Sequence, residues 1–303
     1  MHFLSITDLN KNEITEILQA TKILKANLHQ HHDRLKNKTL AMLFEKPSTR
    51  TRISFEVAMV QLGGYALNLH AGEIQLKRGE AISDTAKVLS RYVDGVMARV
   101  YEHETLIELS KNSTVPVING LSDYEHPCQI ISDLFTIYEQ FPVDFPSKDR
   151  FCDGNREIKL AYIGDGNNVC NSLMLGCAMM GIKMAVAAPE GYEPKIKNKL
   201  INKIKITNDP VEAVKDADIV YTDVWVSMGS EEEAEERLNK FKKYQVNEKL
   251  LSGAKPECKI MHCLPAHRGM EITDVIDGAN SIVWDQAENR LHAQKAVLLK
   301  LLV

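Results

Sequence analysis

The sequence contains no apolar run long enough to cross a lipid bilayer, and its first residues, MHFLS, lack the basic and apolar regions of a secretory signal. Its formal net charge of −4 offers no general attraction for nucleic acid or anionic membranes. Its six cysteines form no dense framework, which favours free thiols over disulfides. These absences predict a soluble cytoplasmic protein with no nucleic-acid or membrane partner, in which any anion site must be local.

Two further classes of site are disfavoured by what is missing. Cys258, His262 and Cys263 carry groups that bind zinc, but no Cys-x-x-Cys pair accompanies them, so we expect no bound metal. A Walker A loop is excluded, because its glycines and its Gly-Lys-Ser/Thr ending are absent. Any phosphate site must therefore use other donors.

The length of 303 residues exceeds the usual size of one α/β unit and predicts two domains of about 150 residues each. Short apolar runs of strand length alternate with helical patterns in both halves of the chain, which indicates an α/β architecture. The strand-like runs lie at 40–44, 65–69, 95–98, 115–118, 160–163, 184–188, 219–222, 260–262 and 282–284. We expect two doubly wound parallel-sheet domains.

The segment 141–157 is the predicted domain boundary, because it contains two prolines, Gly154 and several charges. Residues 1–140 would form the first domain and residues 141–285 the second. The final segment, 286–303, has leucines at helical spacing and is predicted to be a closing helix.

The stretch FEKPSTRTR at 44–52 places anion-binding groups where a predicted strand gives way to a helical pattern. Free N–H groups at a helix start and the macrodipole favour an anion, hydroxyls add donors, and Arg50 can bind oxygens bidentately. In the alternative interpretation, Ser48 and Thr49 only cap the helix while Arg50 and Arg52 lie on its solvated face. Because capping explains only one hydroxyl, we predict a phosphate site.

Other candidate site residues, most of them polar, also follow predicted strands. They are Arg99, His126, Pro127, Cys128, Gln129, Asp165, Asn168, Asp223, Ser227, Cys263, Leu264 and Pro265. Open α/β sheets bind ligands in the crevice beyond the carboxyl ends of their strands. Two such crevices facing each other would form one active-site cleft between the domains.

The residue types in the two halves point to different ligands. His126 and Gln129 lie one helical turn apart and could both donate to a carbonyl oxygen, as acyl transfer requires, although an ordinary hydrogen-bonded loop histidine fits the spacing equally well. Asp223 and the Asn168 amide, in the second half, suit an amine or amino acid. Cys263 lies among histidines and an arginine that would polarise its thiol; a buried inert thiol is the alternative.

Five segments, spread in order over nearly the whole chain, carry a family resemblance. They are FEKPSTRTRISFE at 44–56, EHPCQ at 125–129, GDGNNV at 164–169, DVWVSMG at 223–229 and HCLPAHRG at 262–269. With these segments the chain resembles the ornithine carbamoyltransferases. The STRT and HPxQ motifs are shared with aspartate carbamoyltransferases, whereas the SMG and HCLP segments point to ornithine.

The resemblance implies a carbamoyl phosphate site in the first domain and an ornithine site in the second, with the closing helix packing back on the first. The residues it implies for carbamoyl phosphate are Ser48, Thr49, Arg50, Thr51, Arg99, His126, Pro127, Cys128, Gln129, Cys263, Leu264 and Arg290. Those it implies for ornithine are Asn168, Asp223, Ser227 and Met228. Gln75 would reach the phosphate from a neighbouring subunit of a homotrimer, so that sites would be shared between subunits.

The reaction implied is transfer of the carbamoyl group from carbamoyl phosphate to the δ-amine of L-ornithine, giving citrulline and phosphate in arginine biosynthesis. It requires no cofactor. Arg99 and His126, with Thr51, would polarise the carbonyl oxygen. Asp223 and Cys263 would orient and deprotonate the amino groups, and which of them acts at which end stays open.

Three alternatives compete with this interpretation. A carbamoyltransferase for putrescine, acetylornithine or aspartate is disfavoured by the segment 223–229. A nicotinamide dehydrogenase is suggested by Gly164 and Gly166, but Val169 replaces the third glycine of that fingerprint. A non-catalytic binding module would have damaged site motifs, and all motifs here are intact.

Overall fold

The computed structural model describes residues 1–27, 32–141, 157–226 and 234–303. Contacts within the chain divide it into two compact units. The first consists of Met1–Phe135 and Glu288–Val303, and the second of Thr136–Ala287. The segment expected to be the domain boundary lies almost wholly outside the described residues.

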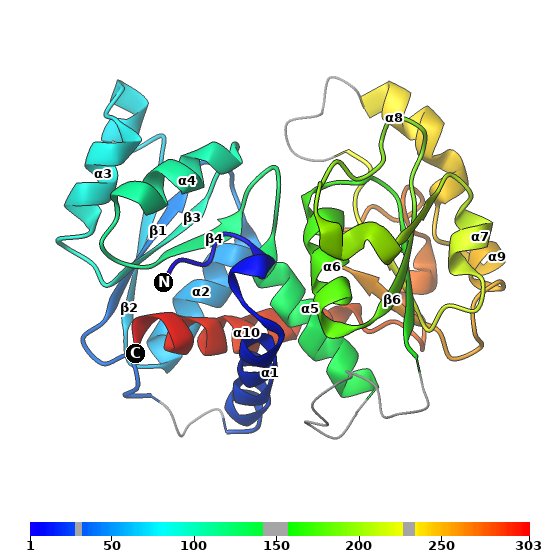
Figure 1. The fold of residues 1–303 in the computed structure, drawn as a ribbon, viewed down its shortest axis with the longest axis horizontal. Coiled ribbons are helices and arrows are strands. Elements are labelled where there is room, and N and C mark those ends of the chain that lie inside the picture. The colour runs from blue at the N-terminus through cyan, green and yellow to red at the C-terminus, as the bar shows by residue number, and fades with distance from the viewer. Residues whose placement is uncertain (28–31, 142–156, 227–233) are drawn as a thin grey trace. The chain divides into compact units, whose positions relative to one another are not determined.

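The first unit is built on a parallel sheet with the strand order β2-β1-β3-β4. Its strands are β1 (Thr39–Phe44), β2 (Tyr65–His70), β3 (Gly95–Arg99) and β4 (Val117–Leu121). Its helices are α1 (Lys11–Ala26), α2 (Thr49–Gln61), α3 (Ile82–Leu89), α4 (His103–Asn112), most of α5 (Pro127–Gln140) and most of α10 (Val283–Leu302), with short 3-10 helices η1 (Ile6–Asp8) and η2 (Gln75–Arg78). Figure 1 shows α3 and α4 on one side of this sheet and α2 and α10 on the other.

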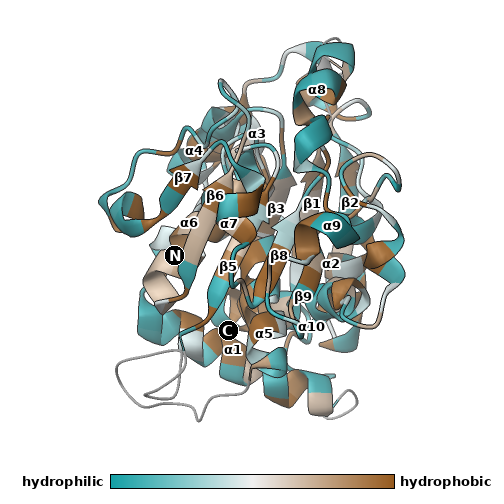
Figure 2. Cartoon of the chain, turned by 90° about the vertical axis from the view of Figure 1, so that its right-hand side faces the viewer, coloured by the Kyte–Doolittle hydropathy of each residue, from teal (hydrophilic) through white to brown (hydrophobic). Residues whose placement is uncertain are grey.

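The second unit is built on a five-stranded parallel sheet with the order β7-β6-β5-β8-β9. Its strands are β5 (Lys159–Ile163), β6 (Lys183–Ala187), β7 (Lys205–Thr207), β8 (Ile219–Thr222) and β9 (Lys259–His262). Its helices are α6 (Asn168–Met180), α7 (Pro210–Val214), α8 (Ala234–Phe241) and α9 (Glu248–Leu251), with short 3-10 helices η3 (Lys199–Lys203), η5 (Lys242–Tyr244) and η6 (Asp274–Asp277). In Figure 2 the strands β5, β6 and β8 are largely hydrophobic and α8 is largely hydrophilic.

Burial on both faces of the sheet explains why strands such as β1 appear in the sequence as continuous apolar runs. Five of the six residues of β1 are buried, because helices cover both faces of a parallel sheet. On one face of the first sheet, Leu106 and Leu109 of α4 pack with Leu43 and Ala98 of the strands. The prediction of an α/β protein with parallel sheets is therefore confirmed.

Some element predictions were wrong. The apolar run 282–284 was expected to be a strand, but Val283 begins α10, and Ser281 makes only an isolated bridge to Ile260. Three apolar residues cannot distinguish a strand from a buried first helical turn. Strand β7 was missed because it is a three-residue edge strand with an exposed Lys205, which gives no apolar run. The strand expected at 115–118 lies at Val117–Leu121.

The strand orders place one topological switch point in each sheet. In the first sheet the chain moves outward in one direction from β1 and in the other from β3, and these two strands are neighbours. In the second sheet the neighbours β5 and β8 have the same relation. Loops that leave such a pair of strands separate and open a crevice at the carboxyl edge, where α/β proteins bind ligands.

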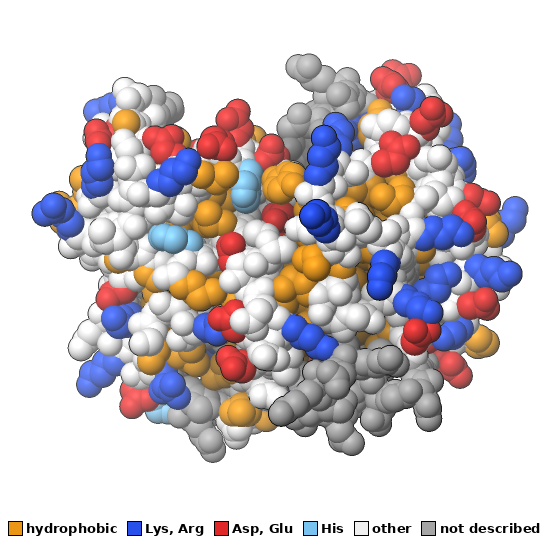
Figure 3. Space-filling model, in the orientation of Figure 1, with side chains coloured by type: hydrophobic (Ala, Val, Ile, Leu, Met, Phe, Trp, Pro, Cys, Tyr) orange, Lys and Arg blue, Asp and Glu red, His pale blue; other side chains and the backbone are white. Residues whose placement is uncertain are grey.

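Neither sign of charge dominates the face of the described residues that is visible in one view. Figure 3 shows acidic and basic side chains interspersed over the visible face. Among the described residues, no helix is long and apolar enough to span a membrane. The five cysteines within the described ranges are all free thiols.

Candidate active site

The predicted phosphate motif lies where β1 ends and α2 begins. Ser48 is the N-cap of α2, and its side-chain oxygen accepts a hydrogen bond from the backbone N–H of Thr51 at 3.2 Å. Thr49 is exposed, Ser48 and Arg50 are half-buried, and Thr51 is fully buried. Ser48 thus caps the helix, but one capping bond leaves other N–H groups of the first turn available to an anion.

Two further arginines come from distant parts of the chain. Arg99 is the last residue of β3 and pairs in the sheet with Phe44, the last residue of β1. Arg290, on α10, donates from its Nη2 to the Thr51 hydroxyl at 2.7 Å. Both arginines are almost completely buried. With Arg50 they bring three positive charges to the first turn of α2.

His126 immediately precedes α5 and is buried. Its pKa is held well below the ordinary value, chiefly by burial and then by the positive charges of Arg290, Arg99 and Arg50. The imidazole is therefore neutral at neutral pH and carries one N–H donor. A neutral donor among three arginines is the arrangement that stabilisation of a carbonyl oxygen requires.

The helix that follows His126 supplies an amide and a thiol. Gln129 donates from its Nε2 to Asp133 at 2.8 Å, which leaves one amide hydrogen for a ligand. Cys128 donates to the Asn119 carbonyl at 3.3 Å, and burial raises the pKa of its thiol to about 12. The Cys128 thiol is therefore neutral and unreactive at neutral pH. Pro127, the first residue of α5, is also buried.

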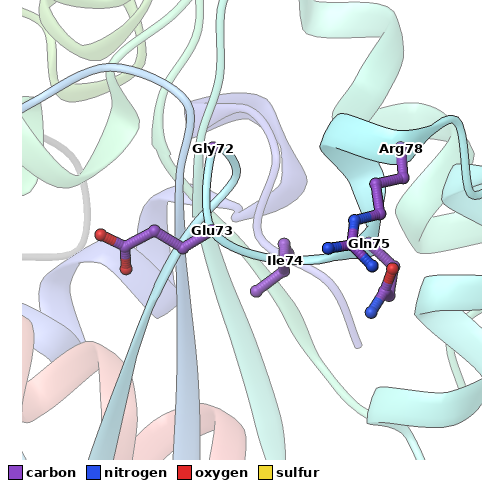
Figure 4. Close-up of a pocket in the computed structure, with 5 residues that line it drawn as sticks. All are labelled: Gly72, Glu73, Ile74, Gln75 and Arg78. Atoms are coloured by element: carbon purple, nitrogen blue, oxygen red, sulfur yellow. The ribbon is translucent and has the colours of Figure 1, made fainter.

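Gln75 lies elsewhere. It begins η2, is exposed, and lines a separate pocket of about 420 Å³ formed by Gly72, Glu73, Ile74, Gln75 and Arg78. Figure 4 shows the Gln75 amide beside the Arg78 guanidinium, with Glu73 pointing the other way. None of the other residues predicted for carbamoyl phosphate lines this pocket. The first unit therefore assembles its phosphate motif without Gln75.

The second unit gathers its polar groups at the β5/β8 switch point. Asn167, the N-cap of α6, accepts from the backbone N–H groups of Val169 and Cys170. Its Nδ2 donates to Asp223, directly after β8, at 2.7 Å. Asn168, which the sequence favoured, is the half-buried first residue of α6. The residue that holds Asp223 is therefore Asn167, the neighbour of the predicted Asn168.

Cys263 joins this group from the end of β9. Its half-buried thiol donates to the other Asp223 oxygen at a sulfur–oxygen distance of 2.9 Å. Leu264 follows with a φ of 59°, in the left-handed region that disfavours a branched side chain. Its backbone N–H donates to His262 Nδ1 at 2.9 Å, which fixes the chain beside the thiol.

Asp223, His262 and Cys263 bring potential metal ligands within 4.8 Å of one another. However, both ring nitrogens of His262 are used: Nδ1 accepts from Leu264, and Nε2 contacts Glu271 at 3.3 Å. A histidine whose two nitrogens are satisfied by protein groups is not available to a metal. The group is better suited to hold an amine beside a thiol and a carboxylate.

Asp165 and Arg237 form a second charged pair in the same unit. Asp165 lies between β5 and α6, and its carboxylate accepts from Arg237 Nη1 at 2.9 Å. Burial, together with a smaller effect of the Asp223 charge, raises the pKa of Asp165 to about 6 despite the opposing effect of Arg237. Arg237 had no sequence signal other than its place in an otherwise ordinary charged helix.

Ser227 and Met228, expected to bind ornithine, lie outside the described residues.

Three functional candidates were missed by sequence reasoning: Asn167, Arg237 and Gln286. Gln286 accepts from the His262 backbone N–H and donates to the Tyr221 hydroxyl, so it supports the end of β9 from α10. Of these three, only Asn167 has a signal in the sequence, because one of the two asparagines in GDGNNV can be expected to cap the following helix.

Comparison with known proteins identifies the family. Residues 1–139 match the carbamoyl-P binding domain of aspartate/ornithine carbamoyltransferases, and residues 156–301 match the Asp/Orn binding domain of the same family. The chain belongs to the aspartate/ornithine carbamoyltransferase family. The resemblance seen in the sequence motifs is thereby confirmed.

Relatives from the ornithine branch of the family are similar over nearly their full length. The ornithine carbamoyltransferase of Archaeoglobus fulgidus is 56% identical over 99% of this chain and 97% of its own length. That of Methanosarcina acetivorans is 56% identical over 99% and 98%. The solved structure of the Pyrococcus furiosus ornithine carbamoyltransferase has 52% identity and a TM-score of 0.90 over 99% of this chain and 96% of that one.

The position of His126 generates a prediction about acid stability. Below its ordinary pKa of 6.5 an exposed histidine of the unfolded chain binds a proton, whereas native His126 does not. The unfolded state therefore binds more protons, and the free energy of unfolding falls as pH falls. Between pH 7.5 and 5.5, His126 should contribute about 1.4 kcal/mol to that fall.

Urea unfolding of wild type and His126→Asn at the two pH values measures this contribution, because the asparagine cannot titrate. The variant should lose about 1.4 kcal/mol less than wild type between pH 7.5 and 5.5. Cys128→Ser is the matched control, since it disturbs the same buried region with a group that stays neutral in this range. Equal pH slopes for wild type and His126→Asn would show that native His126 takes up its proton over the same pH range as in the unfolded chain, and would contradict the lowered pKa.

Proposed function

We propose that this chain is an ornithine carbamoyltransferase, which transfers the carbamoyl group of carbamoyl phosphate to the δ-amine of L-ornithine and releases citrulline and phosphate. The observation that carries this proposal is the opposite charge of its two switch-point sites. The first unit gathers three arginines at a helix start, and the second gathers a carboxylate, an amide and a thiol. Such sites suit an anionic phosphate and a cationic amino acid, respectively.

In this proposal the first unit, with the C-terminal helix, binds carbamoyl phosphate. The first turn of α2 and Arg50 hold the phosphate oxygens, and Arg99 and Arg290 neutralise further charge. His126 and Gln129 donate to the carbamoyl group. Residues Ser48, Thr49, Thr51, Pro127, Cys128, Cys263 and Leu264 complete the proposed shell.

The second unit binds ornithine. Asp223 pairs with an amino group, since its two oxygens already face an amide and a thiol in a fixed orientation. Asn168, Ser227 and Met228 complete the proposed ornithine site. Cys263 is the further candidate for orienting or deprotonating an amine, because its thiol shares Asp223.

The transfer follows from these charges. The δ-amine loses a proton, and its lone pair attacks the carbamoyl carbon. The bond between that carbon and the bridging phosphate oxygen then breaks, and its electrons leave with phosphate. Arg99, His126 and Thr51 stabilise the charge on the carbonyl oxygen. Holding both substrates in attack geometry supplies much of the rate, since effective molarities reach on the order of 10⁵–10⁸ M.

We also propose a homotrimer whose sites include Gln75 from a neighbouring subunit. Gln75 is exposed and separate from the phosphate motif of its own unit, as that role requires. Apolar side chains are exposed on α2, at Ile53 and Val60, and on the neighbouring edge strand β2, at Tyr65 and Leu67. An exposed apolar edge of this kind is a candidate subunit interface.

A cytoplasmic enzyme of arginine biosynthesis fits these features. Free thiols are typical of a reducing compartment, and the five described cysteines are unbridged. The Pyrococcus furiosus relative is named an anabolic ornithine carbamoyltransferase. That name supports citrulline formation as the direction of the reaction.

The direct test of the reaction is a product assay. Purified protein with carbamoyl phosphate should form citrulline from ornithine, at a rate that rises with pH because only the neutral amine attacks. Parallel assays should contain putrescine, acetylornithine or aspartate in place of ornithine. A higher kcat/KM with one of these acceptors would identify another carbamoyltransferase, and no turnover with any would favour a binding protein.

The shared site has its own test. Gln75→Ala and Cys263→Ala chains should each be poorly active alone, because each lacks one part of every site. After unfolding, mixing and refolding, some sites should combine an intact Cys263 with Gln75 from a neighbour, and citrulline formation should recover partly. Each variant refolded separately is the control. No recovery in verified mixed trimers would mean that each site is built from a single chain.

A further inference from the structure

Arg237 makes three contacts from the first half of α8, and its side chain is only 12% exposed. Its Nη1 donates to the Asp165 carboxylate at 2.9 Å and to the Trp225 carbonyl at 3.2 Å. Its guanidinium also lies 4.8 Å from the centre of the Tyr192 ring, within the range of a cation–π contact. One side chain therefore joins three loops at the carboxyl edge of the second sheet.

The contact with Asp165 is linked in two steps to Asp223, the carboxylate proposed to bind ornithine. The Asp165 backbone carbonyl accepts from the Tyr162 hydroxyl at 2.9 Å and from the Asn167 N–H at 2.8 Å. Asn167 then donates from Nδ2 to Asp223 at 2.7 Å. The conformation of the turn from Asp165 to Asn167 thus sets the position of one of the donors that hold Asp223.

The Trp225 end leads to the same place along the chain. Trp225 follows Asp223 by two residues, and its ring lies 5.9 Å from that of Phe241, at the other end of α8. Arg237 is therefore linked to Asp223 by two routes. One runs through space by way of Asp165 and Asn167, and the other runs along the chain from Trp225. Among the described residues, no other cationic side chain donates a hydrogen bond to the Asp165 carboxylate or to the Trp225 carbonyl.

We propose that Arg237 is a positioning residue for the acceptor amino acid, acting through Asp165 and Trp225 on the orientation of Asp223. The inference rests on the proposed function. It adds a residue outside the family motifs, and it predicts an effect confined to one of the two substrates. Arg237 does not touch the reacting atoms in this account.

Charge explains why an arginine is required. Asp165 is buried beside Asp223, and Lys195 acts on it less strongly than Arg237 does. Without Arg237, the buried Asp165 carboxylate would be left near the charge of Asp223 with little compensation, so Asp165 would take up a proton or move away. Lysine would keep the charge but not the planar guanidinium that stacks on Tyr192 while donating to two acceptors.

The test compares Arg237→Met and Arg237→Lys with wild type in steady-state citrulline formation. Arg237→Met should raise the KM for ornithine about tenfold or more and leave the KM for carbamoyl phosphate within about twofold. Arg237→Lys should recover part of that loss. Lys255→Met is the matched control, because it breaks the 2.7 Å ion pair to buried Asp218, which directly precedes β8 at the amino-terminal ends of the strands. This variant should leave both KM values unchanged.

Asp165→Asn provides a second route if Arg237→Met does not fold. It keeps the shape of the side chain, removes the charge, and should also raise the ornithine KM selectively. The double variant with Arg237→Lys should be less impaired than the sum of the single effects, since both changes act on one contact. Additive effects would mean that the two residues act separately.

The failure of this inference is distinct from failure of the proposed function. If wild type forms no citrulline from ornithine, the proposed function is wrong. If wild type is active but Arg237→Met or Asp165→Asn leaves the ornithine KM unchanged, Arg237 is not a positioning residue. Equal rises in both KM values, or a similar rise in Lys255→Met, would show only a general structural role and would also overturn the inference.

Discussion

The concentration of positive charge at the first turn of α2 is the constraint on which the rest of this structure depends. Arg50 comes from the helix itself, Arg99 from the end of β3 and Arg290 from the C-terminal helix, so three distant segments must fold together to create it. Burial and then these positive charges lower the pKa of His126, so its imidazole stays neutral beside them. A neutral imidazole can donate to a carbonyl oxygen while the arginines bind phosphate. In the proposed function, one charge cluster thus selects the phosphate ligand and lies beside the group that polarises the carbonyl oxygen.

The second unit applies the opposite charge to the same architectural position. Its β5/β8 switch point holds Asp223 between the Asn167 amide and the Cys263 thiol. A carboxylate fixed on both oxygens favours an ammonium group of defined orientation, because moving away would break two hydrogen bonds. In the proposed function, two sheets of similar topology bind substrates of opposite charge, and the difference lies in a few side chains placed on their loops.

The sequence predicted much of this arrangement, and its errors have physical causes. The FEKPSTRTR motif was interpretable because backbone N–H groups, hydroxyls and arginines cooperate locally at a helix start. Arg290 was implied only by the family resemblance, because its contact with Thr51 joins residues far apart in the chain. The sequence does not distinguish the two neighbouring asparagines, and the structure shows that the Asn167 amide reaches Asp223. Arg237 looked like one charge among many on a polar helix.

We infer that charge divides the two substrates between the two units. Isothermal titration calorimetry with carbamoyl phosphate, on Arg50→Met and Asp223→Asn, tests it most directly. Arg50→Met should weaken carbamoyl phosphate binding by about tenfold or more, because it removes a charge-assisted donor, whereas Asp223→Asn should stay within about twofold of wild type. Unchanged binding in Arg50→Met, or lost binding in Asp223→Asn, would contradict the account.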